Sequence, residues 1–259
     1  MGNGIRGDRP EFASGSGQQF PLASRWPVVV REGQQPSILD PAQLTFPERG
    51  WDPDWRCWLH VAEFAATPWR ERIRIDDPPT PDVTRSEIEG LLEDAERQRA
   101  DSIPEIRAQH DVAITYFDQL LMANPLAYPA TATLISVGVL AGQMIAVHFK
   151  AKFNRPRPSQ VCPALLPPMP VPGHPAYPSG HALQSHLIAQ LVSLIRPDME
   201  PSLLALAARV TRNRELAGFH YPSDGKAGRQ AASGAFSIMR DLPGLQAAVA
   251  EAKCEWPAP

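Results

Sequence analysis

Three short clusters along the chain combine cations, glycine and histidine in a way that could bind an oxyanion and react with it. The clusters are Lys150-x6-Arg157, Pro178-Ser179-Gly180-His181 and Arg214-x5-His220-x3-Asp224. Each cluster alone is a weak signal, because a cation before a proline is usually a solvated helix end and a Pro-Ser-Gly turn usually caps a helix. Together they supply complementary parts of one site.

The first part of that site is a set of donors for a multiply charged anion. Lys150 offers a point charge, while Arg157 and Arg214 offer planar forks that match pairs of oxygens. If a helix begins at His181, the Ser179 hydroxyl and the Gly180 N–H lie at its N-terminus, where unpaired amides and the dipole favour an anion. We therefore predict that these five residues bind a tetrahedral or trigonal-bipyramidal oxyanion such as phosphate or vanadate.

The second part of the site is catalytic. His220 and Asp224 are four residues apart, so on a helix or helical turn they share a face and the carboxylate can accept a hydrogen bond from Nδ1–H. The Nε2 atom of His220 is then free to attack phosphorus as a nucleophile or to ligate vanadium. Histidine in general titrates near neutral pH, so His181 suits a general acid toward a leaving oxygen or an acid/base for bound peroxide.

The elements that must position these clusters are helices. The capping signature Thr84-x-x-Glu87 predicts a helix start, and a second helical pattern resumes after Pro104 and stops at Pro125. Further helical patterns cover residues 130–147, 181–195, 202–219, 224–239 and 244–253. Repeated prolines predict a stiff, extended loop over residues 162–178. No segment is typical of a sheet, so we predict an all-α helical bundle.

The domain organisation follows from composition along the chain. We predict a tail over residues 1–25 and a single helical domain over residues 26–259, with a site-bearing core at about 84–240. The first part of that domain is a tryptophan-rich, irregular layer with short helices near residues 54–66. The first twenty residues lack the apolar core of a secretory signal, which favours a cytoplasmic location. Residues 130–147 approach the length of a membrane span, but we predict a buried core helix and no span.

Composition excludes several classes of protein. The chain has 259 residues, of which 43% are hydrophobic, and a formal net charge of −3. A nucleic-acid-binding protein would need an excess of Lys and Arg, so we expect no such partner. The three cysteines are widely spaced and follow no metal-ligand pattern, which argues against a disulfide framework or a zinc site. Whether the chain forms a homo-oligomer stays open.

In this order, the three clusters resemble the signature of the superfamily that joins type 2 phosphatidic acid phosphatases, bacterial class A acid phosphatases and vanadium-dependent haloperoxidases. The resemblance covers residues 150–224 and departs from the family at Asn213, where the family usually has Ser. It implies an enzyme built as a helical bundle, with His181 as acid/base and His220 bonded to phosphorus or vanadium. The oxyanion ligands that it implies are Lys150, Arg157, Ser179, Gly180 and Arg214.

The signature itself does not separate the two activities, but its context favours one of them. His174 matches a position where algal bromoperoxidases carry a second histidine that tunes halide oxidation, and residues 154–158 and 215–221 also look more like the haloperoxidase branch. The chain length is closer to that of class A acid phosphatases. Val147 replaces an aromatic residue that haloperoxidases often have.

Our leading expectation is therefore a vanadate-dependent haloperoxidase that oxidises halide with hydrogen peroxide. In it, vanadate is the cofactor, His220 is its ligand and His174 tunes the halide step. The alternative is a soluble acid phosphatase that hydrolyses phosphomonoesters through a phosphohistidine at His220, with phosphate in the same site. A membrane-embedded lipid phosphatase and a non-catalytic anion-binding protein are disfavoured, the first because one apolar segment cannot build a multi-helix membrane bundle.

Overall fold

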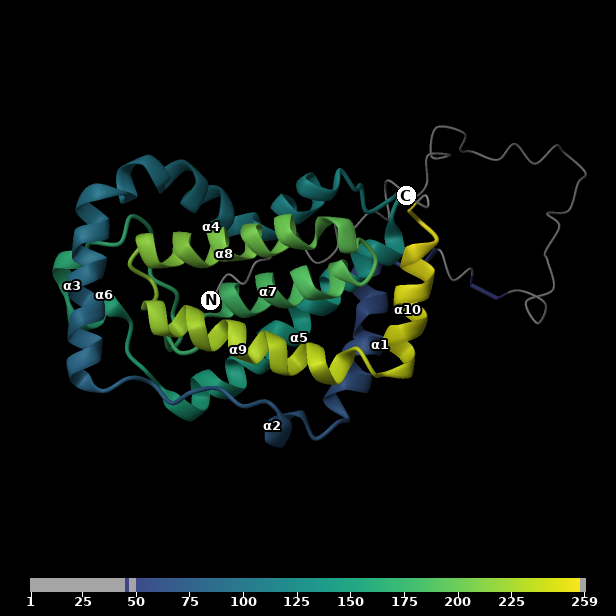
Figure 1. Cartoon of the computed structure of the whole chain (residues 1–259), viewed down its shortest axis with the longest axis horizontal. Coiled ribbons are helices and arrows are strands. Elements are labelled where there is room, and N and C mark those ends of the chain that lie inside the picture. Colours follow the sequence, from purple (N-terminus) through teal and green to yellow (C-terminus); the bar gives the residue numbers. More distant parts are fainter. Residues whose placement is uncertain (1–44, 47–49, 257–259) are drawn as a thin grey trace, which may run out of the picture.

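A computed structural model shows that the chain folds into a bundle of α-helices (Figure 1). It describes residues 45–46 and 50–256, so the predicted tail over residues 1–25 lies outside the described residues. The helices are α1 (Pro53–Ala65), α2 (Trp69–Arg72), α3 (Pro81–Arg97), α4 (Arg99–Leu121), α5 (Pro129–Phe153), α6 (Pro158–Val161), α7 (Gly180–Ser193), α8 (Glu200–Leu216), α9 (Pro222–Met239) and α10 (Pro243–Lys253), with 3-10 turns at Pro163–Leu165 and Pro197–Met199. The described ranges contain no strand, and the all-α prediction is confirmed.

Helix α7 lies at the centre of the bundle. Helices α8 and α9 flank it and α5 packs against it, while α1 and α10 cross α5 at one end and α3 and α6 lie at the other (Figure 1). Three leucines one turn apart on α7, Leu183, Leu187 and Leu191, have no exposed surface. Burial of one such side chain contributes about 1.5–3 kcal/mol to the free energy of folding. The central helix is therefore held rigidly, and whatever its N-terminus carries is held with it.

Helix α5 supplies the most apolar surface of the core. The helical segment Pro129–Val161 is long and apolar enough to cross a membrane, with a mean hydropathy of 1.8, but 72% of its most apolar window is buried inside the protein. Small residues allow close packing here, since Gly138 faces Ile188 and Gly142 faces Gln184 on α7. The core helix of a soluble protein has these properties, so this segment is weak evidence for a membrane span.

Two predicted helix boundaries were wrong. Helix α3 begins at Pro81 rather than at Thr84, because a proline at the first helical position already has the φ angle that a helix needs. Helix α4 begins at Arg99 and passes through Pro104, and its non-helical residue is Val112. The guanidinium of Arg99 fixes this start: it is buried and donates to the backbone oxygens of Leu165, Leu166 and Leu216.

The turn between α8 and α9 brings two of the predicted site residues together. Helix α8 ends at Leu216, and Gly218 follows with a φ of +72°, the left-handed conformation that glycine adopts without steric cost. The N–H of Phe219 donates to the backbone oxygen of Arg214 at 3.1 Å. The chain therefore folds back at once, and His220 lies beside the last turn of α8.

A close contact between α9 and the start of α7 gives a first prediction. A Cβ atom on Gly228 would lie 2.8 Å from the backbone oxygen of Ser179 and 2.8 Å from the Cβ of Ala182. We expect Gly228→Ala to lower the free energy of unfolding by about 1–3 kcal/mol, because α9 must move away from α7. Urea unfolding followed by circular dichroism measures this change.

The matched control is Gly90→Ala on α3, where a Cβ atom would meet no atom within 4 Å. That substitution should raise stability by about 0.5–1 kcal/mol, since alanine favours a helix over glycine. Equal effects of the two substitutions would contradict the predicted clash.

Candidate active site

The three sequence clusters meet around one cavity of about 210 Å³, which we call the inner cavity. It lies between α5, the N-terminus of α7 and the α8–α9 turn. Its lining residues are Gln143, Ala146, Val147, Lys150, Arg157, Pro172, His174, Gly180, His181, Gln184, Arg214 and His220. Two predicted site residues, Ser179 and Asp224, do not line it but contact the residues that do.

The N-terminus of α7 forms one wall of this cavity. Ser179 is the N-cap, as predicted: its hydroxyl accepts a hydrogen bond from the N–H of Ala182 at 3.4 Å, and its own N–H donates to the backbone oxygen of Asp224 at 3.0 Å. Gly180 begins the helix, and the nearest atom to a Cβ there would be that of Ala146 at 3.9 Å. The first-turn N–H groups of a helix have no partner within the helix, so this wall suits an anion.

Arg157 follows helix α5 and is 1% exposed. Its Nε donates to the backbone oxygen of His174 at 3.0 Å, and its Nη1 donates to the backbone oxygen of Phe219 at 2.8 Å. Nη1 also lies 3.0 Å from Nε2 of His220. The guanidinium therefore covers the atom that would act as nucleophile, and an incoming anion has to draw it aside.

Lys150 and Arg214 complete the cationic lining. The ammonium group of Lys150 donates to the backbone oxygens of Pro175 at 2.7 Å and Ala176 at 3.0 Å. Arg214 stacks on Phe219 and approaches His110 through Nη1, but its buried Nε and Nη2 atoms have no hydrogen-bond partner. Buried guanidinium donors without partners are costly, and an anion in the inner cavity would satisfy them.

His220 is oriented by a buried carboxylate. Its Nδ1 atom lies 3.0 Å from Oδ2 of Asp224, which also accepts from the N–H of Tyr221 at 3.1 Å. The predicted contact is present, although not through a shared helix face: His220 precedes α9, and Asp224 reaches back from its first turn. The hydrogen-bond network favours the tautomer with the proton on Nδ1, which leaves the lone pair of Nε2 to accept from Nη1 of Arg157.

His181, the second residue of α7, lies on the same cavity. Its side chain is 6% exposed, and its Nε2 atom has no hydrogen-bond partner. An unpaired imidazole nitrogen next to the predicted nucleophile is placed to exchange a proton with a bound substrate.

The electrostatics of the inner cavity favour an anion. Burial lowers the pKa of Arg214 to about 9 and that of Arg157 to about 10. Burial, together with the neighbouring cations, also holds the pKa values of His181 and His220 well below 6.5. Each of these shifts disfavours the charged form, first because the groups are buried and, for Arg214, His181 and His220, also because other cations lie nearby. A bound phosphate dianion would reverse the shifts.

These pKa shifts predict how stability depends on pH. His181 and His220 bind protons less readily in the folded protein than in the unfolded chain, so folding stability should fall as the pH drops below 6.5. Burial raises the pKa of Asp224 to about 6, so protonation of this one carboxyl group favours the folded protein as the pH falls. Burial lowers the pKa values of His174 and His186 to about 4, so these two histidines also make the folded protein less stable at acidic pH.

Thermal unfolding between pH 8 and pH 5, with and without inorganic phosphate, measures this dependence. Phosphate at about 100 times its dissociation constant should raise stability by about 2.7 kcal/mol. A melting temperature that phosphate leaves unchanged throughout would contradict an anion site.

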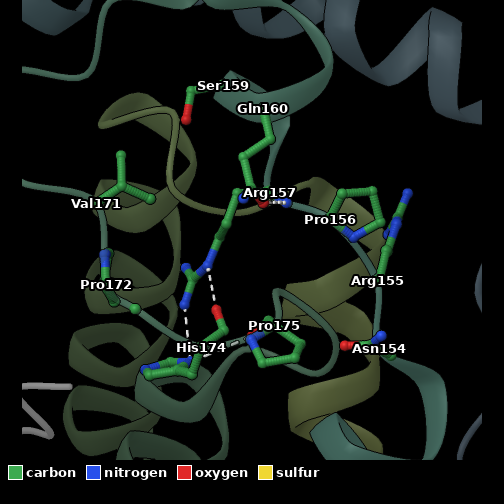
Figure 2. A pocket seen from close by; sticks show the side chains of 11 residues that line it. Asn154, Arg155, Pro156, Arg157, Ser159, Gln160, Val171, Pro172, His174 and Pro175 are labelled. Carbon is green, nitrogen blue, oxygen red and sulfur yellow. Dashed lines mark hydrogen bonds between the residues drawn. The ribbon is translucent and has the colours of Figure 1, made fainter. Parts of the chain in front are cut away.

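A second pocket of about 590 Å³, the outer pocket, lies on the other side of Arg157 and shares Arg157, Pro172 and His174 with the inner cavity. Figure 2 shows Arg157 reaching from the linker after α5 toward His174. Nδ1 of His174 lies 2.9 Å from Nη2 of Arg157. The predicted role of His174 beside the site stays a prediction, and in the structure this residue contacts Arg157.

Sequence reasoning missed several residues behind the site. Arg155 contacts Asp224 and is almost fully buried, and the motif around it gave no sign of this contact. Asn213, where the family pattern would have Ser, donates to Gln109 of α4 at 2.8 Å. Gln143 and Gln184 line the inner cavity without belonging to any cluster. These residues could have been identified only from knowledge of which distant helices contact one another.

Comparisons with known proteins agree with this geometry. Residues 131–240 match the sequence profile of the PAP2 superfamily. A non-specific acid phosphatase of Providencia stuartii is 32% identical over 81 residues, which make up 31% of this chain and 33% of that protein. Those of Salmonella typhi and Salmonella typhimurium are 31% and 30% identical over 80 residues. The chain therefore spans about a third of the length of the curated relatives it matches.

These relatives correct the leading expectation. The expected haloperoxidase activity, with halide and peroxide as substrates, was wrong, because the matched proteins are acid phosphatases. The error arose because the same cations, histidines and carboxylate suit phosphate and vanadate equally, so context outside the clusters was given too much weight. The alternative, a phosphatase, fits the matches better.

Proposed function

We propose that this chain, which matches the PAP2 superfamily over residues 131–240, is a phosphatase that hydrolyses phosphomonoesters through a phosphohistidine at His220. The observation that carries the proposal is the position of His220: the residue lines the inner cavity, Asp224 holds its Nδ1, and Nε2 contacts Arg157, a cationic residue of the same lining. The carboxylate orients the imidazole for attack, and the three cations around it hold the anionic substrate within its reach.

In the first step, the substrate phosphate enters the inner cavity and accepts hydrogen bonds from Arg214, Lys150 and the N-terminus of α7. Arg157 moves from Nε2 of His220 to the phosphate oxygens. The negative charge of the bound phosphate favours a protonated His181, which takes its proton from solvent. Nε2 of His220 then attacks phosphorus, the P–O bond to the alcohol breaks, and the leaving oxygen takes that proton from His181. The cations stabilise the charge on the equatorial oxygens, and no further reactant is needed.

In the second step, His181 accepts a proton from a water molecule that attacks the phosphohistidine. The P–N bond breaks, Nε2 regains its lone pair, and inorganic phosphate leaves. Because His181 is neutral after the first step, it is in the correct state to act as base in the second. His220 keeps its orientation throughout, since Asp224 stabilises the positive charge on the imidazole during attack.

Vanadate fits the same donors, because it shares the charge and the tetrahedral shape of phosphate. We propose that it acts as an inhibitor held by Arg157, Arg214 and Lys150, not as a resident cofactor. A five-coordinate vanadate bound at His220 would resemble the transition state of phosphoryl transfer, and such compounds bind more tightly than substrates.

Hydrolysis of p-nitrophenyl phosphate between pH 4.5 and pH 7.5 tests the proposal, together with rapid quenching under alkaline conditions to trap phosphohistidine. The expected result is turnover, inhibition by vanadate and phosphate, and a phosphorylated peptide that contains His220. Turnover without a trapped phosphohistidine would favour direct attack by water. Absence of turnover with several phosphomonoesters would overturn the proposed function.

A further inference from the structure

We propose that Arg155 and Glu87 form a positioning pair that holds Asp224 against His220 and thereby keeps the nucleophile oriented. This inference rests on the proposed function. It extends the site beyond the residues that line the inner cavity, to a helix outside the segment that matches the PAP2 profile.

The contacts of Arg155 are directed at Asp224 and at helix α3. Its Nη1 donates to Oδ1 of Asp224 at 2.7 Å and to the hydroxyl of Ser223 at 2.7 Å. Its Nη2 donates to Thr84 and to Oε2 of Glu87, both at 3.1 Å. The side chains therefore form a chain of three alternating charges, Glu87, Arg155 and Asp224, which ends at the imidazole of His220.

Arg155 cannot serve as an anion ligand in this arrangement. It does not line the inner cavity, and both of its terminal nitrogens are occupied by α3 and α9. Figure 2 shows its side chain turning away from Arg157. Its guanidinium also lies 3.7 Å from the ring centroid of Tyr221, which fixes its plane. Its effect on catalysis has to pass through Asp224.

Glu87 fixes the other end of the chain. Its Oε1 accepts from the N–H of Ser223 at 2.7 Å, and its Oε2 accepts from the hydroxyl of Ser223 at 2.9 Å. These bonds tie α3 to the first turn of α9, two residues from Tyr221. The sequence pattern that suggested a helix cap, Thr84-x-x-Glu87, thus provides two ligands for Arg155 instead.

Burial makes this support necessary. Asp224 has no exposed surface, and a carboxylate without water needs charged or N–H donors to stay ionised. Oδ2 serves His220 and Tyr221, so Oδ1 depends on Arg155. If Arg155 were lost, Asp224 could rotate or take up a proton, and His220 would lose its anionic partner. Residues that support a catalytic group in this way typically change activity about 10–100-fold.

Steady-state kinetics with p-nitrophenyl phosphate test the pair. Arg155→Met should lower kcat by about 10–100-fold, while KM and the inhibition constant of inorganic phosphate change by less than about twofold. Arg155→Lys should recover part of kcat, because it keeps the charge. The matched control is Arg85→Met on the exposed face of α3, which should change nothing. An increase in KM and in the phosphate inhibition constant as large as the loss of kcat would make Arg155 an anion ligand and overturn the proposal.

A double-mutant cycle asks whether Arg155 acts through Asp224. In an Asp224→Asn background, Arg155→Met should change kcat by less than about threefold, since the carboxylate that it supports is gone. The same loss of kcat in both backgrounds would overturn the proposal.

Histidine-selective ¹⁵N labelling gives a readout that does not depend on turnover. The Nδ1 proton of His220 should exchange slowly in the wild type and at least about tenfold faster in Arg155→Met. Faster exchange in a protein without phosphatase activity would support the positioning pair and reject only the proposed function. Unchanged exchange in an active protein would reject the pair and leave the function in place.

Should Arg155→Met fail to fold, Glu87→Gln provides the test. The glutamine keeps an oxygen for the N–H of Ser223 but removes the ion pair with Arg155. We expect kcat to fall by about 3–10-fold with KM unchanged, because the variant loses one charge-assisted hydrogen bond between residue 87 and Arg155. Glu89→Gln, on an exposed position of the same helix, is the control. A kcat equal in the two variants would overturn the proposal.

Discussion

Replacement of His220 by alanine should abolish phosphatase turnover, with kcat lower by about 10⁵-fold or more. The reason is that Nε2 of His220 is the proposed nucleophile, whereas His181, on the same cavity, has the role of acid and base. Arg157 and Arg214 remain in the variant, so inorganic phosphate should still bind and still raise the melting temperature. Stopped assays with p-nitrophenyl phosphate and thermal shift with phosphate measure the two effects.

A histidine elsewhere in the fold provides the control for this experiment. His60 lies on α1 and does not line the inner cavity, so His60→Ala should keep wild-type turnover. If His220→Ala retained more than about a hundredth of the wild-type kcat, the phosphohistidine route would be rejected.

Replacement of His181 by asparagine should lower turnover by an amount that depends on the leaving group. For an alkyl phosphate, which needs a proton on its leaving oxygen, kcat/KM should fall by about 10²–10⁴-fold. For 2,4-dinitrophenyl phosphate the loss of kcat/KM should be much smaller, because that phenolate leaves without protonation. The second step also loses its base, so a burst of dinitrophenolate should precede a slow steady state.

The ratio of the two losses is the informative quantity. Equal losses of kcat/KM for both substrates, without a burst, would mean that His181 does not transfer the proton. The Nε2 atom of His181 would then only contribute to binding, since it lies unpaired on the inner cavity. Wild-type protein assayed with the same two substrates supplies the reference ratio.

Local signals predicted much of this fold. Apolar periodicity located α7, α8, α9 and α10 to within a few residues, and α7 begins at Gly180, one residue before the predicted start at His181. These features depend on neighbours in the sequence, which is why they could be predicted. The same logic was wrong at Thr84, where a capping pattern lies inside a helix and its side chains bind Arg155.

Contacts between distant segments could not be predicted in this way. Arg155 and Glu87 are 68 residues apart in the chain, and neither has a local pattern that indicates a partner. We predicted from the sequence that Arg157 binds an anion. The structure adds that its guanidinium lies 3.0 Å from Nε2 of His220 and 2.9 Å from Nδ1 of His174. Which donors are occupied depends on how helices pack, and that packing is a property of the whole chain.

The sequence by itself determined the helical class and the types of side chain that serve an oxyanion, because helix period, caps and charge are local properties. It did not determine the activity, since one donor set suits phosphate and vanadate alike. Tertiary structure alone decided that Lys150, Arg157, Arg214, His181 and His220 share one cavity, and that Arg155 stands behind Asp224. Convergence requires residues far apart in the chain to be brought within a hydrogen bond of each other, and only the packed bundle fixes those distances.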